Sequence, residues 1–175
     1  MKAEVGSQKS EFQELAFVAL GSNLGDSRKI ILDAMMRLQK FSDGLILKSS
    51  LWQTSPVDCP PDSPKFVNAV AGLISQKNET PESLLKKLRE LEKEFGRAPK
   101  KISNEPRALD LDLIAFGNEV RNLRELVLPH PRAHLRKFVL QPLAEIAPQL
   151  ILPGQTKTVS RLLAEISPRE MLTRL

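Results

Sequence analysis

Cysteine and long apolar runs are nearly absent from this 175-residue sequence, and both absences exclude classes of protein. Cys59 is the only cysteine, so no disulfide can form within the chain and an oxidising compartment is not indicated. There is no run of about 18 apolar residues, so we expect no membrane-spanning helix. The polar residues 1–13 lack the apolar core of a signal peptide and are expected to form a disordered tail. The sequence therefore predicts a cytoplasmic protein that binds no membrane.

Familiar signatures of nucleotide and RNA binding are also missing. The Walker A pattern G-x-x-x-x-G-K-[ST] does not occur, which excludes a P-loop kinase as far as motifs can. No strand has the K/R-G-F-G-F-V-x-F pattern of an RNA-binding module. A polymerase-β type nucleotidyltransferase needs an aspartate pair soon after a Gly-Ser turn, whereas Asp110 lies far downstream of Gly21-Ser22. We expect no nucleic-acid partner.

The net charge of +5, from 26 basic and 21 acidic residues, is compatible with an anionic ligand. Nucleotide phosphate and nucleic acid are both such ligands, and a basic surface that only aids solubility is the plain alternative. Composition does not decide among them.

The order of predicted elements indicates the fold class. They are a strand at 15–20, a helix at 27–41, strands at 44–54 and 65–75, a helix at 81–95 and a strand at 108–116. This β-α-β-β-α-β order is typical of a ferredoxin-like α+β fold, in which helices pack on an antiparallel sheet. Helices near 138–146 and 158–166 would be C-terminal additions, and the last residues are expected to fray. We predict one domain over residues 14–170.

The segment "RALDLDLIAFG", residues 107–117, places two carboxylates in an apolar strand. Because side chains alternate along a strand, Leu109, Leu111 and Leu113 share one face, and Asp110 and Asp112 share the other. The two aspartate Cα atoms would lie about 6.5–7 Å apart, where like charges repel. The pair is therefore either solvated or bridged by a cation.

A basic loop before the aspartate pair favours the cation. Arg97, Lys100, Lys101 and Arg107 precede the aspartates directly. Mg²⁺ usually takes one or two carboxylates together with substrate phosphates. An acidic pair beside a basic loop therefore suits a metal-bound polyphosphate.

Four segments together resemble a known family. In order they are "ALGSNLGD", "TSPV" with "FVNAV", "EPRALDLDLIAFG" and "LPHPRAHLRKFVLQPLAEIAP". Over about residues 15–155 they resemble 6-hydroxymethyl-7,8-dihydropterin pyrophosphokinase of folate biosynthesis. The resemblance implies a single pyrophosphokinase domain that moves the β,γ-pyrophosphoryl group of its co-substrate ATP to the hydroxymethyl group of the pterin, giving AMP. We expect a monomer with these two small-molecule substrates.

The resemblance also implies roles for individual residues. Asp110 and Asp112 match the ligands of two Mg²⁺ ions that lie between this pair and the ATP phosphates. Arg97 and Arg107 match catalytic arginines that act on the phosphates, with a planar fork suited to phosphate oxygens. The other implied ATP-binding residues are Glu92, Lys100, His130 and Arg136. The implied pterin-binding residues are Thr54, Val57, Phe66, Asn68 and Phe138.

Plainer alternatives stay open at several of these positions. Arg97 could instead stabilise a helix C-terminus. A lone histidine after a proline, such as His130, is often structural, and Glu92 could be a solvated helix residue. Phe66 and Phe138 lie in apolar runs, so core packing would also explain them.

The sequence departs from the family pattern in one loop. The family commonly has Trp-Gly before Pro-Arg, where this chain has Asn104 and Glu105. A loop tryptophan that could close over the pterin is therefore absent, and Glu105 adds a negative charge near the phosphates. Pro99 and Trp52 also differ from the usual residues, and we expect the substrate class to be unaffected.

Overall fold

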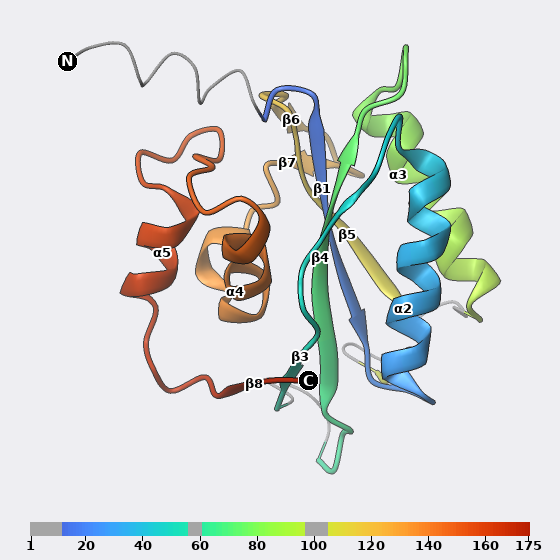
Figure 1. Ribbon diagram of the computed structural model, residues 1–175, viewed down its shortest axis with the longest axis vertical. Helices are drawn as coiled ribbons and strands as arrows, with labels where there is room; N and C mark the ends of the chain where they lie inside the picture. Colours follow the sequence, from blue (N-terminus) through green and yellow to red (C-terminus); the bar gives the residue numbers. More distant parts are fainter. Residues whose placement is uncertain (1–11, 56–60, 97–104) are drawn as a thin grey trace.

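A computed structural model describes residues 12–55, 61–96 and 105–175, and shows a six-stranded antiparallel sheet between two layers of helices (Figure 1). The strands are β1 (Leu15–Ser22), β2 (Leu47–Lys48), β3 (Trp52–Thr54), β4 (Phe66–Ile74), β5 (Asp110–Phe116) and β8 (Leu172–Arg174). The helices are α2 (Ser27–Leu38), α3 (Pro81–Glu94), α4 (Lys137–Ile146) and α5 (Val159–Glu165). A separate hairpin joins β6 (Arg121–Asn122) to β7 (Val127–Leu128), and 3₁₀ turns cover Gln39–Phe41 and Ala133–Leu135. None of the described helices is long and apolar enough to cross a membrane.

The strand order confirms the predicted ferredoxin-like α+β class. Along the sheet the order is β5-β1-β4-β3-β8, and β2 also pairs with β4. The unit β1–α2–β3 is split by β4, and the unit β4–α3–β5 is split by β1. This is the split β-α-β arrangement expected from the predicted element order.

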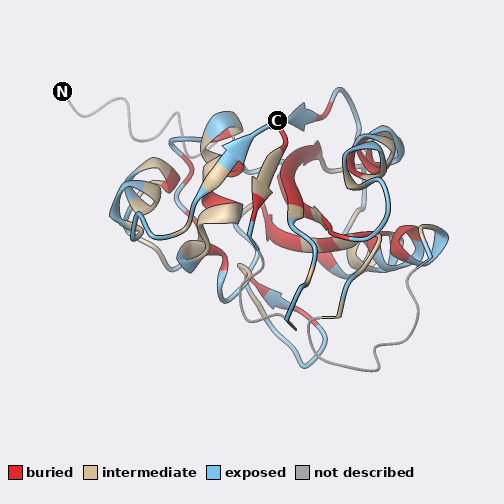
Figure 2. Ribbon diagram, turned by 90° about the horizontal axis from the view of Figure 1, so that it is seen from below, coloured by how far each residue is buried: buried red, intermediate tan, exposed pale blue. Residues whose placement is uncertain are grey.

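Two hydrophobic cores lie on opposite faces of the sheet. Val18 and Leu20 of β1 pack under α2 and α3, whereas Phe17, which precedes Val18 and points to the other face, packs toward α4 and α5. The apolar run at the start of β1 is explained by this double coverage, because a central strand buried on both faces needs apolar residues at successive positions. Figure 2 shows the buried strands enclosed between the two layers.

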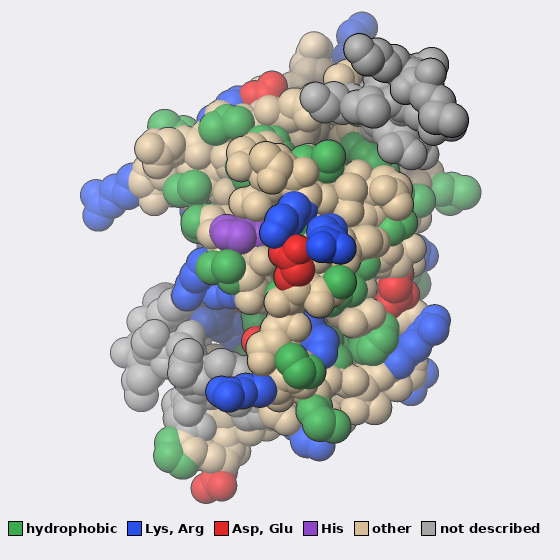
Figure 3. Space-filling model, turned by 90° about the vertical axis from the view of Figure 1, so that its left-hand side faces the viewer, with side chains coloured by type: hydrophobic (Ala, Val, Ile, Leu, Met, Phe, Trp, Pro, Cys, Tyr) green, Lys and Arg blue, Asp and Glu red, His purple; other side chains and the backbone are tan. Residues whose placement is uncertain are grey.

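The α4–α5 layer is the one that sequence analysis described only as a C-terminal addition. Leu140 and Leu143 of α4 are fully buried against the sheet. On the exposed side of α5, Glu165 is paired with Lys157 and Arg161. Figure 3 shows this side of the molecule, with basic side chains distributed over it.

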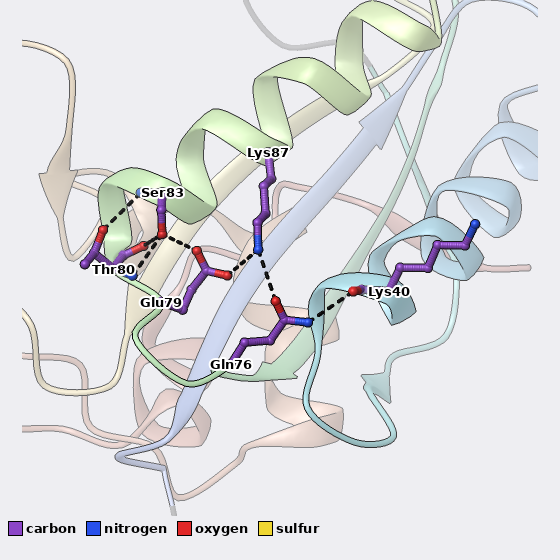
Figure 4. A network of polar contacts seen from close by, with 6 residues as sticks. All are labelled: Lys40, Gln76, Glu79, Thr80, Ser83 and Lys87. Carbon is purple, nitrogen blue, oxygen red and sulfur yellow. Dashed lines mark hydrogen bonds and ion pairs between the residues drawn. The ribbon is translucent and has the colours of Figure 1, made fainter.

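Helix α3 begins as its sequence predicts. Thr80 caps the helix, accepting a hydrogen bond from the Ser83 backbone N–H at 3.1 Å, and Pro81 occupies the first turn. Around this cap, Glu79 accepts hydrogen bonds from Ser83 and from Lys87 (2.6 Å), as Figure 4 shows. The helix ends before Gly96, whose φ of 87° is unfavourable for other residues.

Two predictions about strands are changed by the structure. The strand expected over 44–54 is interrupted between β2 and β3, because Ser49 bonds to Val70 in place of a regular ladder: its N–H donates to the Val70 carbonyl (3.0 Å) and its hydroxyl accepts from the Val70 N–H (2.9 Å). The final residues, expected to fray, include β8, which pairs with β3. The sheet therefore extends beyond residue 170.

The core beneath α3 yields a test of this packing. Leu88 is fully buried in α3, so Leu88→Ala should lower the free energy of unfolding by about 2–5 kcal/mol through lost contacts and a residual cavity. Glu90→Ala, at an exposed position of the same helix, is the control and should change it by less than about 0.5 kcal/mol. Urea unfolding followed by circular dichroism measures both, and equal effects would contradict the packing.

Candidate active site

The aspartate pair lies on the face of β5 that is turned toward the α4–α5 layer. Leu111 and Leu113 are buried in the core under α2 and α3, so Asp110 and Asp112 point to the opposite face. Both aspartates are half-buried. The predicted division of this strand into an apolar face and a carboxylate face is confirmed.

The aspartates face a floor made of small residues on the neighbouring strand. Gly21 of β1 is paired with Asp110 on one side and with Asn68 of β4 on the other, while Ala19 is paired with Asp112. A Cβ on Gly21 would lie 3.4 Å from the Asn68 Oδ1 atom. Ala19 and Gly21 are half-buried although their strand is central, so the α4–α5 layer leaves this part of the sheet accessible.

Arg107 is held beside the aspartates by its side chain and by its backbone. Its Nη1 donates to Asp110 Oδ1 at 2.7 Å, in a pair whose side chains are 17% and 27% exposed. The buried Asn23 accepts a hydrogen bond from the Arg107 N–H at Oδ1 (2.9 Å), and its own N–H donates to the Arg107 carbonyl (3.1 Å). In the sequence, Asn23 is only one residue of the segment "ALGSNLGD", and nothing in the chain order indicates that it would fix residue 107.

A β-bulge positions His130 at the edge of the sheet. In the pairing of β1 with β5, Phe17 is opposite Ala115 and Val18 is opposite Leu113, which leaves Ile114 without a partner on β1. The Ile114 carbonyl instead accepts a hydrogen bond from the His130 N–H at 2.8 Å. The bulge thereby attaches the segment after β7 to the aspartate strand.

His130 has one ring nitrogen engaged and a low basicity. Its Nδ1 accepts a hydrogen bond from the Arg132 N–H at 3.2 Å, so the neutral ring has its proton on Nε2. Burial, together with the charges of Arg136 and Arg132, lowers the pKa of His130 to about 4 against the opposing effects of a backbone hydrogen bond and Asp110. The imidazole is therefore neutral near pH 7 and can donate through Nε2.

Arg136 lies close enough to His130, Arg132 and the aspartates for their charges to interact. Burial lowers the pKa of its guanidinium, Arg132 adds to this, and Asp112 and Asp110 oppose it. The structure thus brings the predicted residues His130 and Arg136 close to both aspartates. Arg132 completes the group and was missed, because sequence analysis assigned roles only to the family positions on either side of it.

A cleft of about 780 Å³ opens beside Asp112, between α3, β5 and the segment from residue 124 to residue 131. Apolar side chains line part of it, and the charged side chains around it include Arg89, Lys93 and Arg124. Glu92, predicted to bind ATP, also lines this cleft. It is 2% exposed, and its carboxylate accepts a hydrogen bond from the Leu111 N–H at 2.8 Å, so it is not a solvated helix residue.

Three of the residues predicted to bind a pterin lie across Gly21 from the aspartates, on β3 and β4: Thr54, Phe66 and Asn68. Asn68 Nδ2 donates to Thr54 Oγ1 at 2.9 Å, and both side chains are buried. Phe66 begins β4 and Phe138 lies in the first turn of α4, each half-buried. The Arg136 guanidinium lies 5.5 Å from the centre of the Phe138 ring. Phe138 packs at the margin of the α4–α5 core, and Phe66 is in neither core.

Some predicted residues cannot be placed. Arg97, Lys100 and Val57 lie outside the described residues, as does Asn104. Glu105 is described and half-buried.

The donor set at the aspartates fits magnesium brought in with a polyphosphate. Within residues 12–55, 61–96 and 105–175, no three or more His, Cys, Asp and Glu side chains form a metal-binding group. Asp110 and Asp112 supply two hard carboxylates side by side. Mg²⁺ commonly uses one or two carboxylates and takes its other ligands from substrate phosphates and water. Two carboxylates therefore suffice for this ion if a phosphate ligand is present.

Comparison with known sequences identifies the family. The sequence model of 7,8-dihydro-6-hydroxymethylpterin-pyrophosphokinase matches residues 17–148. The chain is 43% identical over 140 residues to 2-amino-4-hydroxy-6-hydroxymethyldihydropteridine pyrophosphokinase of Pseudomonas aeruginosa, covering 78% of this chain and 83% of that one. It is 35% identical over 158 residues to the protein of the same name from Haemophilus influenzae, covering 90% and 96%.

Some relatives are much longer. The folic acid synthesis protein fol1 of Pneumocystis carinii is 38% identical over 149 residues, which are 85% of this chain and 20% of that protein. Among solved structures, an HPPK-DHPS in complex with substrates has a TM-score of 0.68 at 12% identity, covering 87% of this chain and 43% of that one. The wild-type HPPK-DHPS of Plasmodium falciparum has a TM-score of 0.64 at 16% identity, covering 86% and 42%. These structural matches support the fold alone.

The family match and the two bacterial relatives confirm the family and the enzyme class that the sequence motifs predicted. This chain belongs to the 7,8-dihydro-6-hydroxymethylpterin-pyrophosphokinase family.

Proposed function

We propose that this protein transfers the β,γ-pyrophosphoryl group of ATP to 6-hydroxymethyl-7,8-dihydropterin, giving AMP and the pterin diphosphate for folate biosynthesis. One observation carries the proposal: Asp110, Gly21 and Asn68 lie in one row across three adjacent strands. Neighbouring strands are about 4.8 Å apart, so the backbones of Asp110 and Asn68 are about 10 Å apart. A metal–phosphate site at Asp110 and an amide site at Asn68 would therefore be close enough for one pterin substrate to reach both.

The cleft beside Asp112 suits ATP. Its apolar lining residues can cover an adenine ring, and basic side chains at its margin can meet phosphates. His130 and Arg136 lie toward the aspartates, where the triphosphate would end. Because Glu92 holds the Leu111 N–H at the open edge of β5, we assign it first to fixing the strand that carries the aspartates.

The opposite end of the row suits a pterin. The Asn68 side chain offers a donor and an acceptor to the amide-like edge of the ring, with Thr54 fixing its orientation. Phe66 and Phe138 are aromatic and half-buried, and they would border this pocket, because a flat bicyclic ring stacks well on such faces. Val57 stays a prediction for this pocket.

Asp110 and Asp112 would hold two Mg²⁺ ions against the ATP phosphates, and these ions would neutralise the triphosphate and align the attacking and leaving oxygens. The ion pair between Arg107 and Asp110 supplies a positive charge to the same carboxylate. When a cation takes over that carboxylate, the guanidinium becomes available to phosphate oxygens. Arg107 can then follow the charge that develops during transfer, as Arg97 would.

In the reaction, the pterin hydroxymethyl oxygen attacks the β-phosphorus of ATP, and the bond from that phosphorus to the oxygen of the α-phosphate breaks. The hydroxyl proton is released, and AMP leaves with the bridging oxygen. Neutral His130 donates a hydrogen bond through Nε2 to a phosphate oxygen, and Arg136 supplies a full charge beside it. A cytoplasmic location and a monomeric state remain predictions.

Product identity tests the proposed reaction. The protein incubated with ATP, Mg²⁺ and 6-hydroxymethyl-7,8-dihydropterin should form AMP in equal amount to the pterin consumed, with a reaction lacking the pterin as background. Anion-exchange chromatography separates the nucleotides. Formation of ADP, or of free pyrophosphate without pterin diphosphate, would contradict the proposal.

Asp110→Asn should lower the turnover number about a thousandfold or more, because one hard carboxylate is lost from the metal site. The variant also loses the ion pair to Arg107, which should cost only about 1 kcal/mol of folding stability. Asp33→Asn removes an aspartate that is paired with Lys29 on the outside of α2, and it serves as the matched control. Turnover of Asp110→Asn within tenfold of the control would remove Asp110 from the metal site.

His130 should make folding stability depend on pH. The folded-state pKa of about 4 lies below the unfolded value of 6.5, so the unfolded state binds the proton more readily as the pH falls through this range. Between pH 7 and pH 4.5 the wild type should lose about 1–3 kcal/mol more unfolding free energy than His130→Asn. Urea unfolding at the two pH values gives the difference, and equal losses would show that His130 is not buried as described.

A further inference from the structure

The last residues of the described chain form the edge strand of the main sheet. In β8, Leu172 is paired with Thr54, Thr173 with Gln53 and Arg174 with Trp52. Beyond the strand, the Leu175 N–H donates to the Leu51 carbonyl at 3.0 Å. The whole of β3 is therefore enclosed between β4 and β8. Figure 1 shows β8 beside β3 at one end of the sheet.

The same segment is attached to the start of α4. Lys137 is the first residue of α4, and its Nζ donates to the Glu170 carbonyl at 2.9 Å. Lys137 directly precedes Phe138 and follows Arg136, which lies over the Phe138 ring. The chain before β8 is thus fixed to the helix turn that presents both of these side chains.

A third contact joins β3 to α4 beside the terminal strand. The Glu145 carboxylate of α4 accepts hydrogen bonds from the Ser50 N–H at 3.0 Å and from the Trp52 indole. Burial raises the pKa of Glu145, but these hydrogen bonds and the nearby charge of Arg174 more than compensate and lower it. Arg174 of β8 therefore lies close to the junction of β3 and α4.

We infer that residues 170–175 position the two walls of the pterin pocket. This segment holds Thr54 on β3 and Phe138 on α4 in a fixed arrangement relative to each other. Thr54 is buried and fixes the Asn68 amide, so a shift of β3 would misdirect the recognition amide. The segment is attached at two places, to Lys137 of α4 and to β3. These two attachments limit movement of α4 and β3 relative to each other. The inference rests on the proposed function for the identity of the ligand.

Loosening residues 170–175 should weaken binding of the pterin but not binding of ATP. The cleft assigned to ATP is lined by α3, β5 and residues 124–127, 130 and 131, and β5 is at the opposite edge of the sheet from β8. Strands β1, β4 and β3 separate them, and β1 and β4 are paired with each other along their length. The match to the family model ends at residue 148, so β8 lies outside the part of the chain that defines the family.

Thr173→Pro is the direct test in the full-length chain. Hydrogen-bonded pairs alternate along an antiparallel ladder, so the bond from Leu175 to Leu51 identifies Thr173 as the next residue whose N–H faces β3. Proline removes this donor, and Thr173→Val keeps it, with strand propensity retained. Thr173 is exposed, so neither change disturbs a core. Lys137→Met, which removes the second anchor, is an independent variant.

Calorimetric titration with 6-hydroxymethylpterin, in the presence of Mg²⁺ and saturating α,β-methylene-ATP, measures the affinity of the pocket for the pterin. Thr173→Pro should weaken pterin binding about fivefold relative to Thr173→Val, and Lys137→Met should weaken it in the same direction. Binding of α,β-methylene-ATP itself should stay within about twofold. In turnover assays the KM for the pterin should rise while the KM for ATP is unchanged.

The outcomes separate this inference from the proposed reaction. Unchanged pterin affinity in both Thr173→Pro and Lys137→Met would overturn the positioning role while wild-type turnover still supports the reaction. Equal weakening of pterin and nucleotide would also overturn it, because that result indicates general destabilisation. A wild-type protein that binds the nucleotide but not the pterin would overturn both the proposed function and this inference.

Discussion

The site depends on the two-residue period of β5 in a sheet that is covered on both faces. Alternation sends Leu111 and Leu113 into one core and Asp110 and Asp112 to the other face, where a complete second layer would have buried them. Buried, closely spaced carboxylates would be costly without compensation. The small residues Gly21 and the half-buried Ala19 mark where the α4–α5 layer ends, so the sheet itself becomes the floor of the site.

Opposite charges around that floor are already arranged for a ligand that contains both signs. Arg107 is bonded to Asp110, and Arg132 and Arg136 lie close enough to the ring of His130 to lower its pKa. Like charges held together in a half-buried place repel one another, and each positive group also lowers the pKa of its positive neighbours. A polyphosphate with its divalent cations would satisfy both sets, since the cations would meet the carboxylates and the phosphate oxygens would meet the guanidinium groups. Binding of such a ligand would therefore reduce the repulsion among these groups.

Local patterns predicted much of the fold and the centre of the site. The cap at Thr80, the period of β5 and the order of the first six elements each depend on neighbouring residues, so the sequence determines them. What sequence analysis missed depends on contacts between distant segments. Asn23 binds the backbone of Arg107, and His130 reaches Ile114 only because of a bulge on β5. Arg132 acts through its proximity to His130 and Arg136, which chain order does not express.

Strand β8 shows why short elements at the edge of a sheet are hardest to predict. Three residues with mixed polarity provide no periodic signal, and the strand exists because β3 offers an unpaired edge in the right register. The strand β3 that offers this edge also contains Thr54, whose hydroxyl fixes the Asn68 amide. An element with almost no signature in the sequence is therefore adjacent to the predicted pterin pocket. The aspartate pair, by contrast, lies on a long paired strand inside the region that the family model matches. The position of the aspartates on β5 therefore depends on a long regular ladder, whereas the residues that border the proposed pterin pocket depend also on a three-residue strand at the far edge of the sheet.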